Sequence, residues 1–408
     1  MTEDDNNKVY TSEDKEKAET LDKFFSSVFT VEDMNNIPKL EPGEKSEGKF
    51  LLDIIITVDT VRAKLKALNP NKSPGPDKIY PRILKELSNE LAEPLTYLFK
   101  KSPEEGKLPD DWKHAEVTAI FKKGEKSNPS NYRPVSLTSV VCKIMESFVR
   151  DAIQEHMESN KLYTSCQHGF RRGRSCISQL LEVMEDFTNY IDNGQTFDTI
   201  YLDFRKAFDT VPHARLLCKL KAYGIDGKVV DWIQMFLSNR TQQVRVGKEY
   251  SSRSQVSSGI PQGSVLGPVL FTIFINDLPE GLESLCKIFA DDTKIYNVSN
   301  QKVTIQNDLS KIQEWSLKWQ LFFNGDKCIC LHYGYNNPKY DYYFYNNSNT
   351  KKLSEGEQEK DLGVIFDITL KFDIHINSQV EKANKVTGMI KGILISWINL
   401  PLIIYTKL

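Results

Sequence analysis

Residues 285–298 read LCKIFADDTKIYNV, two strand-like runs on either side of an Asp-Asp pair. The runs 285–290 and 293–298 predict two strands, and Asp291 and Asp292 between them predict a tight hairpin turn. Turns of this length favour Asn-Gly or Asp-Gly because they need positive φ, and two adjacent anions also repel each other. A bound divalent cation would reverse this cost. The sequence therefore predicts a metal-binding hairpin, with an ordinary acidic surface turn as the alternative.

An earlier strand-like run, residues 197–203, also ends in an aspartate. Its odd-numbered residues, from Phe197 to Asp203, would share one face, with Ile200 and Leu202 on the other. Between this strand and the hairpin lies a Gly/Pro loop, SGIPQGS (258–264), which leads into an almost uniformly apolar helix. Glycines there allow close backbone approach to a ligand. Each feature alone is a weak indication of a functional site. Together, the strand that ends in an aspartate, the Gly/Pro loop and the Asp-Asp hairpin form an ordered set along the chain.

Composition and charge narrow the class of protein. Hydrophobic residues make up 40% and charged residues 26% of the 408 residues, which predicts a globular chain with at least two lobes. The net charge is only −2, so contacts with nucleic acid would need local basic strips. Such strips occur at 122–123, at Arg133 and at 171–174, although solvated surface is the alternative.

Other patterns exclude a zinc site and a membrane span. The seven cysteines show no paired metal-site spacing, so we expect reduced thiols. The apolar stretch 393–405 is too short to cross a bilayer, and we expect no membrane contact. Residues 35–49 and 336–352 are rich in turn formers and charge and predict linkers.

Helical periodicity is clear in three further segments. Two predicted amphipathic helices bracket the basic segment at 171–174. A third helix is predicted further along the chain, from Ile305 to Trp319. The apolar residues of those two helices stand at 141, 144, 145, 148, 149 and 153, and at 177, 180, 181, 184, 187 and 191.

The acidic segments and the loop between them resemble the palm motifs of reverse transcriptases from non-LTR retrotransposons, especially the jockey-like elements. The resemblance lies in YLDFRKAFD (201–209), in residues 259–268 and in FADD (289–292), in that order and spacing. Further similar segments are SPGPD (73–77), NYRP (131–134), HGFR (168–171), residues 324–328 and DLGV (361–364). Residues 361–366 resemble the family's primer-grip hairpin.

This resemblance implies an α+β, right-hand polymerase fold of fingers, palm and partial thumb, with an antiparallel palm sheet. It implies an N-terminal linker or extension at 1–70, a reverse transcriptase domain of fingers and palm at 104–366, and a partial, apparently truncated thumb at 367–408. The implied activity is that of an RNA-directed DNA polymerase, a nucleotidyltransferase that joins dNTPs to a DNA primer on an RNA template. Localisation would be nuclear or cytoplasmic, and oligomeric state stays open.

Roles for single residues also follow from the resemblance. Asp203, Asp291 and Asp292 would be catalytic and would hold two Mg²⁺ ions, with Mn²⁺ as a substitute. Aspartates suit this role because hard cations prefer carboxylate oxygens. The expected substrate residues are Lys122 and Arg133 for the triphosphate, Phe208 for selection of dNTP over rNTP, and Gln262 for the nucleotide and template pocket. Lys327 would protonate or neutralise the departing pyrophosphate, unless it is a plain surface lysine.

Two other interpretations remain. A catalytically inactive, nucleic-acid-binding remnant of such an element would keep the fold without the chemistry, although the intact aspartates favour the enzyme. An RNA-dependent RNA polymerase or a maturase-like relative would share the metal site, but it predicts different flanking motifs. Phe208 at the sugar position argues against the RNA polymerase.

Overall fold

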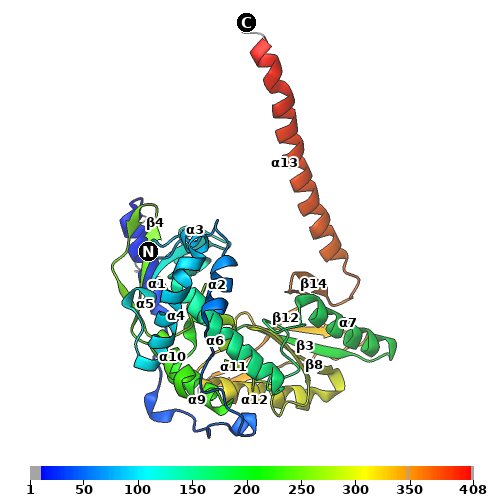
Figure 1. Cartoon of the computed structure of the whole chain (residues 1–408). Coiled ribbons are helices and arrows are strands. Elements are labelled where there is room, and N and C mark those ends of the chain that lie inside the picture. The colour runs from blue at the N-terminus through cyan, green and yellow to red at the C-terminus, as the bar shows by residue number, and fades with distance from the viewer. Residues whose placement is uncertain (1–10, 347–348, 406–408) are drawn as a thin grey trace.

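The computed structural model describes residues 11–346 and 349–405. The first ten residues of the expected extension and the last three of the expected thumb therefore lie outside the described residues. Helices and strands are intermixed along the chain, which confirms the expected α+β class. Figure 1 shows two β-sheets on opposite sides of a helical centre, with the long helix α13 (Asp373–Tyr405) standing away from both.

The first sheet contains the strands next to the aspartates. Its order is β12-β9-β3-β8-β7, in which β3 (Phe197–Leu202) is antiparallel to both β8 (Asp292–Val298) and β9 (Ile329–Tyr333). β7 (Leu285–Phe289) is antiparallel to β8, whereas the edge strand β12 (Ser354–Gly356) is parallel to β9. The expected strand at 197–203 is confirmed. The expected antiparallel pairing holds for every strand of this sheet except β12.

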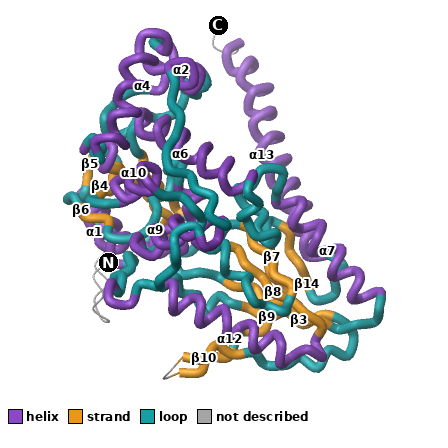
Figure 2. The backbone as a smooth tube through the Cα atoms, turned by 60° about the horizontal axis from the view of Figure 1, so that its bottom comes forward, coloured by secondary structure: helices purple, strands orange, loops and turns teal. Residues whose placement is uncertain are grey.

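Both faces of the first sheet are covered. Figure 2 shows α12 (Lys302–Trp319) and α7 (Cys176–Asp192) on opposite sides of it. The predicted stripe on α7 is only partly right, because Phe187 is buried against the sheet while Ile177 and Leu181 are 69% and 65% exposed. Val183 and Phe187 are buried in the cluster on the sheet, and Leu180, Met184 and Tyr190 pack partly buried against it, so the buried face is centred on Val183 and Phe187.

The second sheet has the strand order β2-β1-β4-β5, with β6 also paired to β4. Its strands are β1 (His114–Phe121), β2 (Tyr132–Leu137), β4 (Arg240–Val246), β5 (Glu249–Tyr250) and β6 (Ser254–Val256). Strand β1 is antiparallel to β2 and parallel to β4. The β1–β2 hairpin therefore lies at one edge of this sheet.

The helix α1 (Asp14–Ser27) packs against the second sheet. Phe25 forms a buried cluster with Val117 of β1 and Val244 of β4. The buried carboxylate of Asp22 accepts hydrogen bonds from Gln242 Nε2 at 3.1 Å and Ser254 Oγ at 2.9 Å. From Asp14 onward, the N-terminal segment is thus attached to the body of the protein.

The helices between the sheets contribute to the largest hydrophobic cluster. These helices are α2 (Val58–Lys66), α3 (Pro81–Glu86), α4 (Ser88–Glu105), α5 (Asp110–Lys113), α6 (Val140–Ser159), α8 (Ala207–Thr210), α9 (His213–Ala222), α10 (Gly227–Leu237) and α11 (Gly267–Phe274). The six apolar positions predicted for α6 are all buried, which confirms that stripe. The helix predicted from Ile305 to Trp319 is also confirmed as α12, and its buried stripe is Ile305, Leu309, Ile312, Ser316 and Trp319. None of the helices within the described residues is long and apolar enough to cross a membrane.

Two hairpins precede α13. Strands β10 (Tyr343–Asn346) and β11 (Asn349–Lys352) form the first, so the linker predicted at 336–352 is wrong there. A polar turn-rich composition does not distinguish a linker from a short exposed hairpin whose strands pair with each other. Strands β13 (Gln358–Asp361) and β14 (Val364–Asp367) form the second hairpin, as expected for residues 361–366.

Candidate active site

The β7–β8 hairpin places its aspartates differently from the prediction. Phe289 pairs with Asp292, so the connection is Ala290-Asp291 and Asp292 already begins β8. The predicted Asp291-Asp292 turn is therefore wrong by one residue, because strand pairing extends into the acidic pair. Ala290 takes the left-handed conformation that such a turn requires, with φ of 55°. Its N–H donates to Oε1 of the buried Gln167 at 3.0 Å, which holds the strained turn in place.

Asp203 follows β3 directly and lies beside the start of β8. The last pair between these strands joins Leu202 to Thr293. The backbone oxygen of Asp203 accepts a hydrogen bond from Asn324 N–H at 2.6 Å, and Lys327 Nζ lies 3.2 Å from its Oδ2 atom. The structure therefore brings together Asp203 and Lys327, two residues proposed as catalytic from the sequence.

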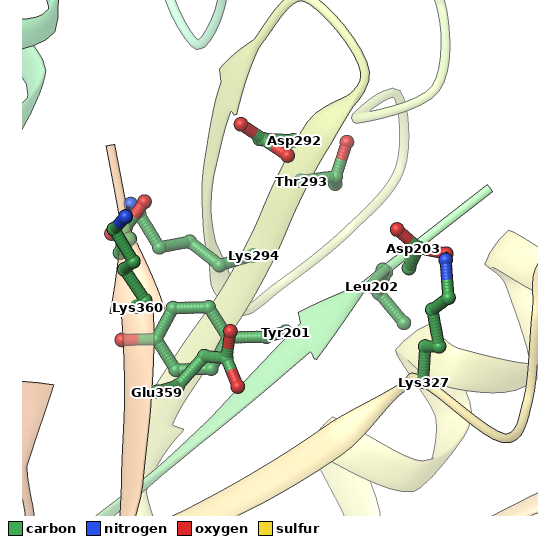
Figure 3. A pocket seen from close by; sticks show the side chains of 10 residues that line it. Tyr201, Leu202, Asp203, Asp292, Thr293, Lys294, Lys327, Glu359 and Lys360 are labelled. Carbon is green, nitrogen blue, oxygen red and sulfur yellow. Dashed lines mark hydrogen bonds and ion pairs between the residues drawn. The ribbon is translucent and has the colours of Figure 1, made fainter. Parts of the chain in front are cut away.

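A pocket of about 270 Å³ opens over this part of the sheet. Figure 3 shows Asp203 with Lys327 on one side of the pocket, and Glu359 with Lys360 from β13 on the other. The complete lining consists of Tyr201, Leu202, Asp203, Asp292, Thr293, Lys294, Lys327, Glu359, Lys360 and Asp361. The β13–β14 hairpin thus forms one wall of the space in front of the aspartates.

Burial and neighbouring carboxylates raise the pKa of Asp291 and of Asp292. Burial raises the pKa of Asp291 first of all, and the negative charge of Asp203 raises it further. The pKa of Asp292 rises to about 6, because the surrounding protein removes part of its hydration and because Asp291 and Asp361 repel its charge. Carboxylates crowded in this way form a favourable environment for a divalent cation.

The donor atoms suit Mg²⁺. Within the residues that the structure describes, no three carboxylate, imidazole or thiol side chains are close enough to enclose an ion. Mg²⁺ is usually held by one or two carboxylates, with water and substrate phosphates as its other ligands. Asp203, at the end of β3, and Asp291, in the β7–β8 turn beside it, fit an ion of this kind, since the charge of Asp203 raises the pKa of Asp291.

Two cationic residues of the second sheet and its hairpin lie near enough to the acidic turn to act on its charge. Arg133 of β2 is paired with Ile120 of β1, and Lys122 N–H donates to Asn131 O at 2.8 Å, so the two cations lie on adjacent segments of one hairpin. The charges of Arg133 and Lys122 both lower the pKa of Asp291. The two predicted phosphate-binding residues therefore lie near the predicted metal ligands.

Lys206 is a third cation at this place, and the sequence reasoning missed it. Burial lowers its pKa first of all, and the charges of Lys122 and Lys327 lower it further. Its position three residues after Asp203, within YLDFRKAFD, was the only available signal. Lys206 therefore belongs to the cation cluster near the acidic turn.

Gln262 links the loop 258–264 to the second sheet. Its Oε1 atom accepts a hydrogen bond from Arg133 Nε at 2.9 Å, and its Nε2 atom donates to Asp209 Oδ1 at 2.7 Å. Gly259 has φ of +83°, and a Cβ atom there would lie 2.5 Å from the Asp209 backbone oxygen. The glycine thus allows the loop to approach α8, and Asp209 is a further site residue that the sequence reasoning missed.

Phe208 is half-buried in α8. Its ring stacks on Phe271 of α11, with 4.5 Å between ring centroids. Its backbone oxygen accepts a hydrogen bond from Ile260 N–H at 2.7 Å. One face of the ring therefore packs against the core while part of the side chain still reaches the surface, so packing and substrate contact are compatible at this position.

Glu146 of α6 is another residue that the sequence reasoning missed. Its buried Oε2 atom accepts hydrogen bonds from Val265 N–H at 2.6 Å and Leu266 N–H at 3.1 Å. These groups lie at the start of α11, where a negative charge is favourable. Burial raises the pKa of Glu146. A charged residue inside the apolar stripe of α6 was the sequence signal for this anchor of the loop.

Comparison with known proteins points to one family. A sequence model described as reverse transcriptase (RNA-dependent DNA polymerase) matches residues 120–366. The RNA-directed DNA polymerase from mobile element jockey of Drosophila melanogaster is 28% identical over 360 residues, which cover 85% of this chain and 38% of that protein. The jockey polymerase of Drosophila funebris is 30% identical over 336 residues, covering 79% of this chain and 36% of that protein.

A third similar protein is the probable RNA-directed DNA polymerase from transposon BS of Drosophila melanogaster. It is 29% identical over 293 residues, which cover 67% of this chain and 32% of that protein. The chain thus spans about a third of the length of these relatives.

Proposed function

The chain belongs to the reverse transcriptase (RNA-dependent DNA polymerase) family, with similarity to jockey-like non-LTR retrotransposons, and we propose that it extends a DNA primer on an RNA template with dNTPs. One observation carries this proposal. Asp203, at the end of β3, and Asp291, in the β7–β8 turn, follow and precede strands that are paired up to Leu202 and Thr293, and the charge of Asp203 raises the pKa of Asp291. A pair of carboxylates at adjacent strand ends suits metal-dependent nucleotidyl transfer.

In this proposal, Asp203 and Asp291 hold the Mg²⁺ ions and Asp292 supports them from the start of β8. When bound, the two ions would stabilise the attacking primer oxygen and the leaving oxygen of the nucleotide. Mn²⁺ would substitute because it accepts the same oxygen ligands. Lys327, whose Nζ lies 3.2 Å from Asp203 Oδ2, would exchange this contact for the departing pyrophosphate and protonate or neutralise it.

The cations beside the acidic turn would bind the triphosphate. The planar guanidinium of Arg133 can meet two phosphate oxygens at once, while Lys122 and Lys206 supply point charges. Phe208 would lie against the 2′ position of the sugar and exclude a hydroxyl there. Its stacking on Phe271 supports this role, because a sugar-selecting ring must be held in one place.

We also propose the right-hand architecture. The first sheet with α6, α11 and α12 would form the palm, and the second sheet with the neighbouring helices would form the fingers. The hairpin β13–β14, which forms a wall of the pocket, would grip the primer, and α13 would belong to the thumb. The divisions at 1–70, 104–366 and 367–408 remain part of this proposal.

Primer extension tests the proposed activity. The assay uses a poly(rA) template, an oligo(dT) primer, dTTP and Mg²⁺, and it compares the unchanged chain with Asp291→Asn. This variant keeps the shape of the side chain but removes its charge, so we expect incorporation to fall by about a thousandfold or more. EDTA should abolish incorporation by the unchanged chain, and added Mg²⁺ should restore it.

Asp231→Asn is the matched control, because Asp231 is an exposed aspartate of α10 outside the site. It should leave incorporation unchanged. Equal incorporation by the unchanged chain and Asp291→Asn would contradict the metal assignment. Tight binding of the RNA–DNA duplex by a folded chain that incorporates nothing would favour the inactive, nucleic-acid-binding remnant.

A further inference from the structure

Asp209 lies at one end of a hydrogen-bonded series that leads to Arg133. The carboxylate of Asp209 accepts from the Gln262 amide nitrogen at 2.7 Å, and the Gln262 amide oxygen accepts from Arg133 Nε at 2.9 Å. A carboxylate can only accept hydrogen bonds and a guanidinium can only donate them. The orientation of the amide is therefore determined by its two neighbours. Without Asp209, the amide nitrogen would lose its acceptor in this series, and only the single bond from Arg133 would favour the orientation that turns the amide oxygen to the guanidinium.

Hydrogen bonds to the backbone fix the position of Asp209 and its neighbour Thr210. Ser258 Oγ donates to the Asp209 backbone oxygen at 2.9 Å, and Thr30 N–H donates to Ser258 Oγ at 2.7 Å. Thr30 Oγ1 also donates to the Thr210 backbone oxygen at 2.8 Å. The segment after α1 is thus linked to α8 and to the loop 258–264. These bonds limit the freedom of the Asp209 backbone and leave its carboxylate to face Gln262.

The charge around Asp209 fits the same role. Burial raises its pKa, while the Gln262 hydrogen bond and the charges of Lys206, Arg133 and Lys122 lower it. These cations are the ones proposed to receive the triphosphate. Asp209 is therefore an anion on the protein side of a cation cluster whose other side would meet the nucleotide.

We propose that Asp209 is a positioning residue for the incoming nucleotide, which acts by orienting Gln262 so that this amide holds the Arg133 guanidinium ready for the triphosphate. Asp209 need not touch the nucleotide. Its removal would free the amide to rotate and the guanidinium to move, so nucleotide binding would weaken before the chemical step changed. This inference rests on the proposed function, because it assumes a dNTP as the substrate.

Steady-state kinetics with poly(rA), oligo(dT) and varied dTTP test the proposal. Asp209→Ala should raise the KM for dTTP by about tenfold and leave kcat within about threefold, since one part-buried hydrogen bond to a charged acceptor is lost. Asp209→Asn keeps an acceptor oxygen and should stay within about threefold of the unchanged chain. Asp231→Ala, at an exposed site, is the control. An unchanged KM in a folded Asp209→Ala variant would overturn the proposal.

A double variant separates positioning from a general structural role. If Asp209 acts through Gln262, Asp209→Ala should change the KM for dTTP by less than about twofold when Gln262 is already alanine. Fully additive effects would overturn the proposal. If Asp209→Ala does not fold, Gln262→Met tests the same link from the other side, and an unchanged KM for dTTP would again overturn it.

Equilibrium binding of dTTP keeps this proposal distinct from the proposed activity. Binding that weakens in Asp209→Ala, in a chain that incorporates nothing, would sustain the inference and contradict the activity. Normal incorporation that depends on Asp291 but not on Asp209 would contradict the inference alone. A folded chain that binds no dTTP would overturn both.

Discussion

At the first residue of β8, the pKa of Asp292 rises to about 6, because the surrounding protein removes part of its hydration and because Asp291 and Asp361 repel its charge. An aspartate in the unfolded chain ionises near pH 3.9. Between about pH 4 and pH 6, the folded protein therefore keeps a proton that the unfolded chain has lost. Ionisation of Asp292 lowers the free energy of unfolding as pH rises through this window, and above about pH 6 the loss is complete.

Asp292→Asn should therefore stabilise the metal-free protein. Because Asp292 is exposed, solvent screening leaves about 1 kcal/mol of added unfolding free energy at pH 7.5. The added unfolding free energy should be about half as large at pH 5, because much of the Asp292 carboxyl of the unchanged protein is then already protonated in the folded state. Urea unfolding in EDTA at both pH values measures it, with Asp231→Asn as control. A less stable variant at pH 7.5 would contradict the repulsion.

Among the elements, β8 and β13 are joined by a buried ion pair. The Lys294 ammonium contacts the Asp361 carboxylate, and the two side chains are only 3% and 4% exposed. Burial lowers the pKa of Lys294, while the charge of Asp361 counteracts this effect. The pair attaches the β13–β14 hairpin to the strand that begins with Asp292. The wall of the pocket and the acidic hairpin are therefore held to each other.

Lys294→Met should lower the free energy of unfolding by about 3 kcal/mol, because it leaves Asp361 buried without a partner. The double variant Lys294→Met/Asp361→Leu removes both charges and should recover most of this loss. Guanidinium unfolding at pH 7.5 measures both. If the double variant were as unstable as Lys294→Met, an unpaired charge would not be the cause of the loss.

Across the whole molecule, the segment after α1 connects the N-terminal helix to the helical centre. The Glu32 carboxylate accepts hydrogen bonds from Ala214 N–H and Arg215 N–H, each at 2.9 Å, at the start of α9. It also lies 3.1 Å from Nη1 of Arg215, a residue that is only 2% exposed. Glu32 thus both caps α9 and balances a buried guanidinium.

Glu32→Ala should cost about 3 kcal/mol of unfolding free energy, because it leaves Arg215 without its carboxylate and α9 without its cap. Glu32→Gln should cost less, since its amide oxygen still accepts one hydrogen bond. Urea unfolding compares both with Glu93→Ala, which changes an exposed glutamate of α4. A Glu32→Ala variant as stable as Glu93→Ala would show that this segment is not part of the folded core.

The local sequence pattern was sufficient to predict the strand β3 and the helices α6 and α12. It also showed the order of the acidic segments around the Gly/Pro loop. These features depend on neighbours within a few positions, where the period of apolar residues and the turn formers are visible. The resemblance of the motifs to those of a known family predicted the family and the α+β class. The expected site residues could be named in this way, but their contacts could not.

Contacts between segments that are distant in the sequence decided the features that the local pattern did not predict. Pairing of Phe289 with Asp292 moved the turn to Ala290-Asp291. Packing on the sheet buried Phe187 of α7 and left Ile177 and Leu181 exposed. The partners of Arg133, the place of Lys206 and the raised pKa of Asp292 depend on segments far apart in the chain. Periodicity describes a single element, whereas register, burial and charge repulsion exist only after two elements meet.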